Sequence, residues 1–193
     1  MSQLPGPGGG QDMGADLSRL VTLVDETALA KTVDRLASRL APRLTGKWTM
    51  VSILVGAVPF TTDLMKALAR RGVHPVLDAL WLESYRDAQE SSGRVVVRAD
   101  LARPVAGRGV LIVDDVFDTG RTLAFARAQM EAKGAAHVLT CALARKPWAP
   151  ETGCDFHAWD APGRFLVGYG MDVAGRYRGL PFIGALDEPS PES

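Results

Sequence analysis

Residues 110–122, VLIVDDVFDTGRT, place three aspartates and a short polar run directly after four aliphatic residues. In the run 119–122, backbone N–H groups, two threonine hydroxyls and the positive end of a following helix could bind one phosphate group. Gly120 lets an anion approach the backbone closely. The alternative, a simple turn with a threonine as helix cap, would set the aspartates against each other at an electrostatic cost with no ligand to offset it. The stretch therefore predicts an anion-binding loop.

Three other classes of phosphate-handling protein share fragments of this string. A Walker A loop needs a lysine before its Ser or Thr and a longer spacing, which this sequence lacks. Receiver domains place their aspartate pair near the start of the domain and have no Thr-Gly-x-Thr loop after it. A haloacid-dehalogenase-type phosphatase needs a second aspartate two residues after its nucleophile, but position 120 is Gly. These differences exclude all three classes.

The elements around this loop follow from hydrophobic periodicity and turn signals. Strands that alternate with helices predict a mostly parallel, twisted α/β sheet, and such sheets bind ligands at the carboxyl ends of their strands. The Asp-rich segment lies at such an end. After Trp148 we expect irregular chain until the run FLVGYG at 165–170. The expected helices cover residues 25–44, 59–71 and 122–133, and the expected strands cover 50–55, 76–84, 94–98, 110–113 and 137–143, with the polar loop 85–93 inside a hairpin.

Composition bounds the remaining possibilities. The 193 residues are 47% apolar, so one domain with one core is expected. The 22 basic and 22 acidic residues cancel, which argues against nucleic acid or a membrane as a partner. Two irregularly spaced cysteines, Cys141 and Cys154, fit reduced thiols and not a disulfide framework or a zinc site. Without a signal peptide or membrane-spanning run, a cytoplasmic location is expected.

The string at 110–122 resembles the phosphoribosyl-pyrophosphate signature of the type I phosphoribosyltransferases, and Asp118 points to their 6-oxopurine branch. Four further segments resemble hypoxanthine phosphoribosyltransferases, so that the resemblance covers residues 17–186 in the family's order. It implies the type I fold: a mostly parallel twisted sheet flanked by helices, a small hood at about 148–186 and a flexible hairpin lid. Residues 1–16 and 187–193 are expected to be disordered tails. The four segments are 51–68 (VSILVGAVPFTTDLMKAL), 84–85 (SY), 143–147 (LARKP) and 165–184 (FLVGYGMDVAGRYRGLPFIG).

The resemblance also implies a role for each matching residue. Asp118 is the general base that takes the proton from the purine N7. Lys146 contacts the 6-oxo group, Phe165 stacks on the base and the carbonyl of Leu166 reads its 2-position. The phosphoribosyl group is bound by Asp114, Asp115, Asp118, Thr119, Gly120, Arg121 and Thr122.

Other matching residues handle the leaving group. Gly56 and Arg178 contact pyrophosphate, and the lid begins at Ser84 and Tyr85. Mg2+ is the implied cofactor, with Asp114, Asp115 and Asp172 as its ligands.

These roles imply a purine salvage glycosyltransferase. It would transfer phosphoribosyl from phosphoribosyl pyrophosphate to hypoxanthine and also guanine, and release IMP or GMP and pyrophosphate. A homo-oligomer, either dimer or tetramer, is expected. The alternatives are a nucleotide-binding regulator of the same fold without catalysis, and a transferase for xanthine or another base.

Two positions depart from the family pattern. The family usually has Lys or Arg where this chain has Val55, and many members carry an arginine after the lysine, where this chain reads Trp148-Ala149-Pro150-Glu151. Both losses predict altered pyrophosphate handling, and we hypothesise that Arg86 compensates from the lid.

Overall fold

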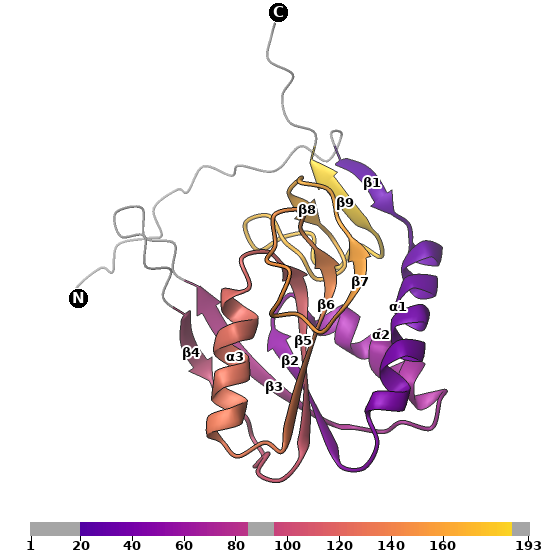
Figure 1. The fold of residues 1–193 in the computed structure, drawn as a ribbon. Helices are drawn as coiled ribbons and strands as arrows, with labels where there is room; N and C mark the ends of the chain where they lie inside the picture. The colour runs from indigo at the N-terminus through magenta and orange to yellow at the C-terminus, as the bar shows by residue number, and fades with distance from the viewer. Residues whose placement is uncertain (1–19, 85–94, 187–193) are drawn as a thin grey trace, which may run out of the picture.

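A computed structural model describes residues 20–84 and 95–186 (Figure 1). Its main feature is a six-stranded sheet with the order β4-β3-β2-β5-β6-β7. All neighbouring pairs are parallel except the hairpin β3–β4. The mostly parallel α/β fold expected from the sequence is therefore confirmed. The strands are β2 (Trp48–Leu54), β3 (Val76–Ser84), β4 (Val95–Ala99), β5 (Gly109–Phe117), β6 (His137–Arg145) and β7 (Phe156–Asp160).

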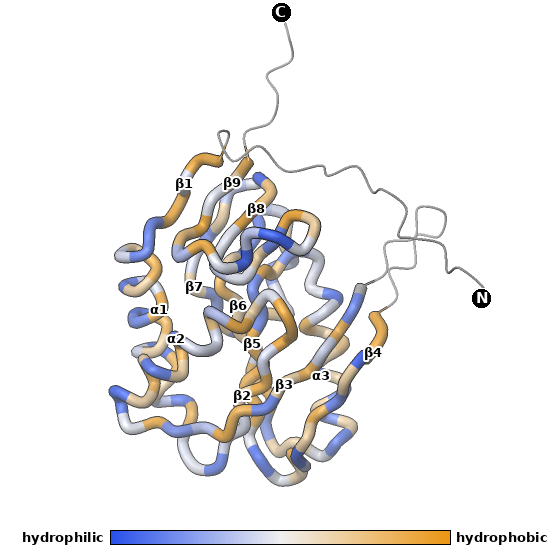
Figure 2. Tube along the Cα trace, turned by 180° about the vertical axis from the view of Figure 1, so that it is seen from behind, coloured by the Kyte–Doolittle hydropathy of each residue, from blue (hydrophilic) through white to orange (hydrophobic). Residues whose placement is uncertain are grey.

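Helices cover both faces of this sheet, as Figure 1 shows. On one face lie α1 (Glu26–Leu40), which Asp25 caps through the N–H of Ala28, and α2 (Val58–Ala69). On the other face lies α3 (Arg121–Ala132). Side chains of a strand alternate between faces, so neighbours such as Met50 and Val51 enter different core clusters. The traces of β2 and β5 are mostly hydrophobic in Figure 2, which fits strands covered on both sides.

A second, three-stranded antiparallel sheet lies beyond the carboxyl ends of the central strands (Figure 1). Its order is β1-β9-β8, with β1 at Leu20–Val24, β8 at Leu166–Val167 and β9 at Ile183–Leu186. This small sheet corresponds to the expected hood, but β1 comes from the opposite end of the described chain.

The expectation of irregular chain between Trp148 and Phe165 was wrong. Strand β7 forms there and extends the large sheet by pairing with β6. Its sequence FHAWD is short and its side chains are only partly buried, so it carries neither an apolar run nor a clear alternation. The hairpin expected at 76–98 is confirmed by β3 and β4, whereas the lid loop between them and both predicted tails lie outside the described residues.

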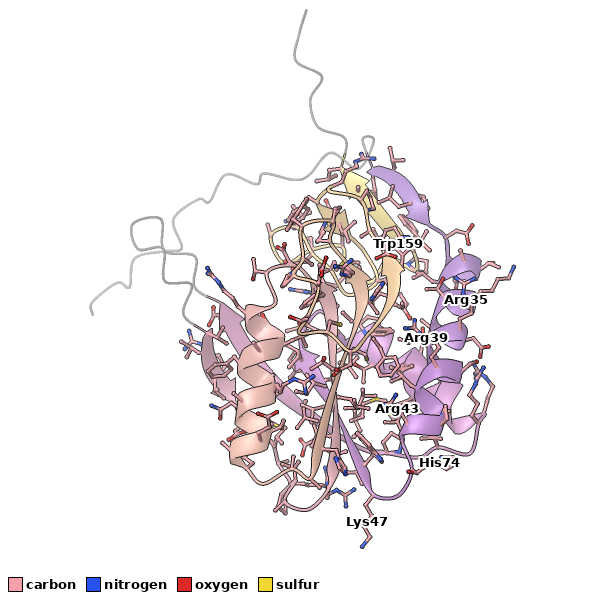
Figure 3. The ribbon with its side chains drawn as sticks, in the orientation of Figure 1. Arg35, Arg39, Arg43, Lys47, His74 and Trp159 are labelled. Atoms are coloured by element: carbon pink, nitrogen blue, oxygen red, sulfur yellow. The ribbon has the colours of Figure 1, made fainter. Side chains whose placement is uncertain are left out.

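Exposed cationic side chains gather at a distance from the Asp-rich strand end. Arg35 and Arg39 are exposed on α1, where Arg39 donates to the His157 carbonyl of β7 at 3.1 Å, and Arg43 follows in the short 3-10 helix η2 (Ala41–Arg43) (Figure 3). Lys47 and His74 precede β2 and β3, at the amino ends of these strands. These side chains therefore cannot bind an anion at the carboxyl ends of the strands, and other groups must do so. Within the described residues, no helix is long and apolar enough to cross a membrane.

Candidate active site

The anion-binding loop connects β5 to α3. Asp114 and Asp115 belong to β5 itself, which continues to Phe117 before the chain turns into the helix. Gly120 caps α3 in the left-handed conformation, with a φ of 77°, and a Cβ there would lie 3.1 Å from the Phe117 ring. Glycine is therefore required by both the backbone and the packing. Because no side chain caps the helix, its first N–H groups face the loop and can bind an anion.

One cavity of about 550 Å³ lies at this strand end. It collects side chains from β5, the loop, the start of α3, the end of β6 and the chain around β8. The residues that line it are Asp114, Asp115, Val116, Phe117, Asp118, Thr119, Gly120, Arg121, Thr122, Leu123, Lys146, Trp148, Gly163, Arg164, Phe165, Leu166, Met171 and Asp172.

The two strand carboxylates have different surroundings. Asp114 is 5% exposed, and its pKa is raised well above the ordinary value, first by burial and then by the charge of Asp115. Its Oδ1 accepts the N–H of Asp115 at 3.1 Å. Asp115 is half-buried, and its Oδ1 accepts the N–H of Val116 at 2.8 Å. Backbone N–H groups therefore hold both carboxylates, and both residues line the cavity.

Gly56 lies against Asp115, in the turn after β2. A Cβ at Gly56 would overlap the Asp115 carboxylate. The Gly56 carbonyl in turn lies so close to Gly170 that a side chain at Gly170 would overlap it. Because neither glycine has a side chain, the turn after β2 packs against the Asp115 carboxylate, and the chain after β8 packs against that turn.

Trp148 joins Asp118 and Lys146 at the other side of the cavity. Its indole Nε1 donates a hydrogen bond to Oδ1 of Asp118, and the ammonium of Lys146 lies 5.6 Å from the ring centroid. Lys146 is 7% exposed and donates to the carbonyls of Arg164 and Pro162, the latter at 3.4 Å. Burial lowers the pKa of Lys146, and the nearby negative charge of Asp118 partly offsets this. The site therefore contains a fixed carboxylate and a fixed cation close together.

Arg178 holds Asp172 at the edge of the cavity. Its guanidinium lies 2.6 Å from Oδ1 of Asp172 and also donates to the Gly170 carbonyl at 2.6 Å. The second oxygen of Asp172 accepts the N–H of Gly175 at 2.6 Å. Both oxygens of this carboxylate are therefore engaged by the protein.

The carboxylates fit a magnesium ion that is shared with a substrate. Among the described residues there is no group of three or more His, Cys, Asp or Glu that could hold a metal. Mg2+ usually takes one or two carboxylates together with substrate phosphates and waters, and does not need an all-protein cage. Asp114 and Asp115, beside an anion loop, supply such a donor set.

Comparison with known proteins identifies the family. The family model "Phosphoribosyl transferase domain" matches residues 21–155. The hypoxanthine-guanine phosphoribosyltransferase of Streptococcus pneumoniae is 34% identical over 169 residues, covering 86% of this chain and 92% of that protein. The chain belongs to the hypoxanthine-guanine phosphoribosyltransferase family.

Solved structures of the family share the fold. The hypoxanthine phosphoribosyltransferase of Staphylococcus aureus superposes with a TM-score of 0.81 at 29% identity, over 88% of this chain and 93% of that chain. That of Trypanosoma cruzi, solved with the product IMP, gives 0.78 at 27% identity over 86% and 93%. The bifunctional protein TilS/HprT of Listeria monocytogenes is also 35% identical over 182 residues, which are 93% of this chain, but the chain spans only 27% of that longer relative.

Most residues that the phosphoribosyltransferase resemblance singled out line the one cavity. Gly56 and Arg178 do not line it but contact Asp115 and Asp172, which do. Ser84 is the last residue of β3, and Tyr85 lies outside the described residues. Their predicted roles stay predictions.

The sequence reasoning missed part of the cavity wall. Gly163, Arg164 and Met171 carry no motif of their own. Trp148 was noted only as part of the segment 148–151, which lacks an arginine, and its contact with Asp118 was not foreseen. The available signal was an aromatic residue with an N–H donor two positions after Lys146, on the same turn.

Proposed function

We propose that this chain transfers the phosphoribosyl group of phosphoribosyl pyrophosphate to a 6-oxopurine, hypoxanthine or guanine, and forms IMP or GMP with release of pyrophosphate. The observation that carries the proposal is the single cavity in which an anion loop, two strand carboxylates, a loop carboxylate, a buried lysine and an exposed aromatic ring meet. Membership of the family supports the same reaction.

The loop and the strand carboxylates suit the sugar phosphate. The 5'-phosphate would bind the N–H groups and hydroxyls of residues 118–122, because these stand at the uncapped N-terminus of α3. Asp114 and Asp115 would accept hydrogen bonds from the ribose 2'- and 3'-hydroxyls, since a carboxylate is an acceptor and charge-assisted bonds are strong.

The base would bind between the residues at the end of β6 and those beside β8. Phe165, which is 60% exposed, offers a free ring face for stacking, and Lys146 offers a cation for the 6-oxo group. The carbonyl of Leu166 would face the 2-position. Because N9 forms the new bond to C1' while the C1'–O bond to pyrophosphate breaks, the base carries an excess proton on N7. Asp118 would accept that proton.

The leaving pyrophosphate would meet Arg178 and the backbone at Gly56. We propose Mg2+ as the cofactor, held by Asp114 and Asp115 with Asp172 nearby, where it would balance the charge of the leaving group. If Asp172 exchanged its contact with Arg178 for the ion, the Arg178 guanidinium would be free to meet pyrophosphate.

Conversion of hypoxanthine, guanine and xanthine in the presence of phosphoribosyl pyrophosphate and Mg2+ tests the proposal. We expect turnover with hypoxanthine and guanine, and a loss of about 10²- to 10⁴-fold in kcat for Asp118→Asn, because the amide cannot accept the proton. Binding of phosphoribosyl pyrophosphate without turnover of any base would instead support the regulator. Turnover of xanthine alone would move the substrate to that base.

We further propose that residues 17–186 form one catalytic domain in a cytoplasmic homo-oligomer. A study of the T. cruzi enzyme concerns the role of its C-terminal region in oligomeric state and activity, which makes the equivalent end of this chain the first place to look for an interface. Size-exclusion chromatography with light scattering, on the full chain and on a chain that ends at residue 186, would test both the assembly and the domain boundary.

A further inference from the structure

Trp148 stands in a turn that is tied to the anion-binding loop. The N–H of Lys146 donates to the carbonyl of Phe117 at 3.0 Å, and the N–H of Ala149 closes the turn on the carbonyl of Lys146 at 3.1 Å. Ala149 is buried, whereas Trp148 is 59% exposed. Burial in the core therefore does not account for the position of the Trp148 side chain, and its contacts in the cavity suggest a role there.

The indole makes three contacts inside the cavity. Its N–H donates to Asp118, and the ammonium of Lys146 lies 5.6 Å from its ring centroid. Gly163 lies against the ring edge, where a Cβ would come within 2.9 Å of the indole. The ring therefore bridges the two charged groups that the proposed function assigns to the base.

The donor has a chemical consequence for Asp118. An indole nitrogen can only donate, so Oδ1 of Asp118 is the acceptor of this hydrogen bond. Within residues 20–84 and 95–186, no hydrogen bond reaches Oδ2 of Asp118. The bond at Oδ1 therefore fixes the carboxyl group and leaves its second oxygen available for a proton.

We propose that Trp148 is a positioning residue that holds Asp118 as an oriented carboxylate, ready to accept the purine proton at Oδ2. This role rests on the proposed function.

Two variants separate the N–H of Trp148 from its ring. Trp148→Phe keeps a ring beside Lys146 and Gly163 but removes the donor. Trp148→Gln loses the ring but carries an N–H donor at the same number of bonds from the Cα. Trp159→Phe, on strand β7 (Figure 3), is the matched control for a Trp-to-Phe exchange, because Trp159 is not among the residues that line the cavity.

Steady-state kinetics over about pH 5 to 9 provide the first test. We expect Trp148→Phe to lower kcat/KM for the base about tenfold near neutral pH, the effect of losing one hydrogen bond to a charged group. The loss should fall on kcat and leave the KM for the base unchanged, since Trp148 acts on the proton acceptor, and Trp148→Gln should recover part of it. The other charged groups of the cavity stay in place in each variant: Asp114, Asp115, Arg121, Lys146, Arg164 and Asp172.

A double-mutant cycle with Asp118→Asn asks whether Trp148 acts through Asp118. We expect Trp148→Phe to have no further effect on kcat in the Asp118→Asn background. A loss confined to the KM, an equal loss in that background, or full activity of Trp148→Phe would overturn the proposal.

The indole N–H resonance of Trp148, assigned from its absence in Trp148→Phe, gives a test without turnover. It should shift with pH in the wild-type protein and lose this dependence in Asp118→Asn. A resonance that does not respond to Asp118 would also overturn the proposal. Failure of the proposed function can be distinguished from failure of this inference. In that case the wild-type protein turns over no base, while the indole N–H resonance still reports the contact with Asp118.

Discussion

Gly56→Ala should weaken binding of phosphoribosyl pyrophosphate without unfolding the protein. The conformation of Gly56 is not the left-handed one, so alanine meets no backbone strain there. Its Cβ would overlap the carboxylate of Asp115 but lie at an ordinary 3.5 Å from the Asp115 Cβ. The obstacle is thus the far end of one side chain. We expect Asp115 to rotate away and lose its bond to a ribose hydroxyl.

The expected size follows from that one bond. A hydrogen bond to a charged group contributes about 1.5–3 kcal/mol, which corresponds to about 10- to 150-fold in affinity. Titration calorimetry with phosphoribosyl pyrophosphate and Mg2+ measures the Kd, and steady-state kinetics measure the KM. Gly179→Ala is the matched control, because a Cβ there meets nothing within 4 Å and the backbone is again not left-handed.

Asp115→Ala provides the decisive background. With no carboxylate to displace, Gly56→Ala should have no further effect on the Kd, so the two losses should not add. Additive losses would show that Gly56 acts elsewhere, for example through its carbonyl beside Gly170. An unchanged Kd for Gly56→Ala alone would refute the steric argument altogether.

Two further predictions concern stability. Burial and the charge of Asp115 raise the pKa of Asp114. The free energy of unfolding therefore falls as pH rises from the pKa of Asp114 in the unfolded chain to its higher pKa in the folded protein. Asp114→Asn should therefore raise the Tm near pH 7.5 by about 2–4 °C per 1 kcal/mol gained, with no such gain near pH 3, while it abolishes activity; an equal change at both pH values would contradict this. Tyr169, 8% exposed, donates from its hydroxyl to Asp63 at 2.7 Å, so Tyr169→Phe should lower the free energy of unfolding by about 1–2 kcal/mol in urea denaturation, and an unchanged midpoint would contradict an anchoring role.

The parts of the fold that the sequence predicted are those with strong local signals. The unbroken aliphatic run of β5, the amphipathic pattern of α1 and the hairpin of β3 and β4 all specify their structure through neighbouring residues. Strand β7 and the small sheet do not. Their strands are two to five residues long, and β1 finds its partner β9 at the opposite end of the chain. Pairing of that kind depends on tertiary contacts, which short patterns cannot encode.

In the site, too, only the residues that belong to one continuous segment or to a family motif could be predicted from the sequence. Residues 114–122 could be predicted because one segment carries the whole anion loop, and the remaining ligands followed from the family resemblance. The partners of those residues could not be predicted. That Gly56 lies against Asp115, or that Arg178 holds Asp172, depends on where the β2 turn and the chain after β8 meet in space.

Trp148 shows how these contacts change the meaning of a substitution. By sequence, Val55 and the segment 148–151 are each expected to lack a cation that the family places near pyrophosphate. In the structure Val55 is 47% exposed and does not line the cavity, whereas the indole of Trp148 contacts both Asp118 and Lys146. A guanidinium at position 148 could donate to Asp118 too, but it would add a second positive charge beside Lys146, whereas the indole donates without charge. Under the proposed function, Trp148 therefore orients the proton acceptor, and we expect Arg178 and Mg2+ to meet the charge of pyrophosphate.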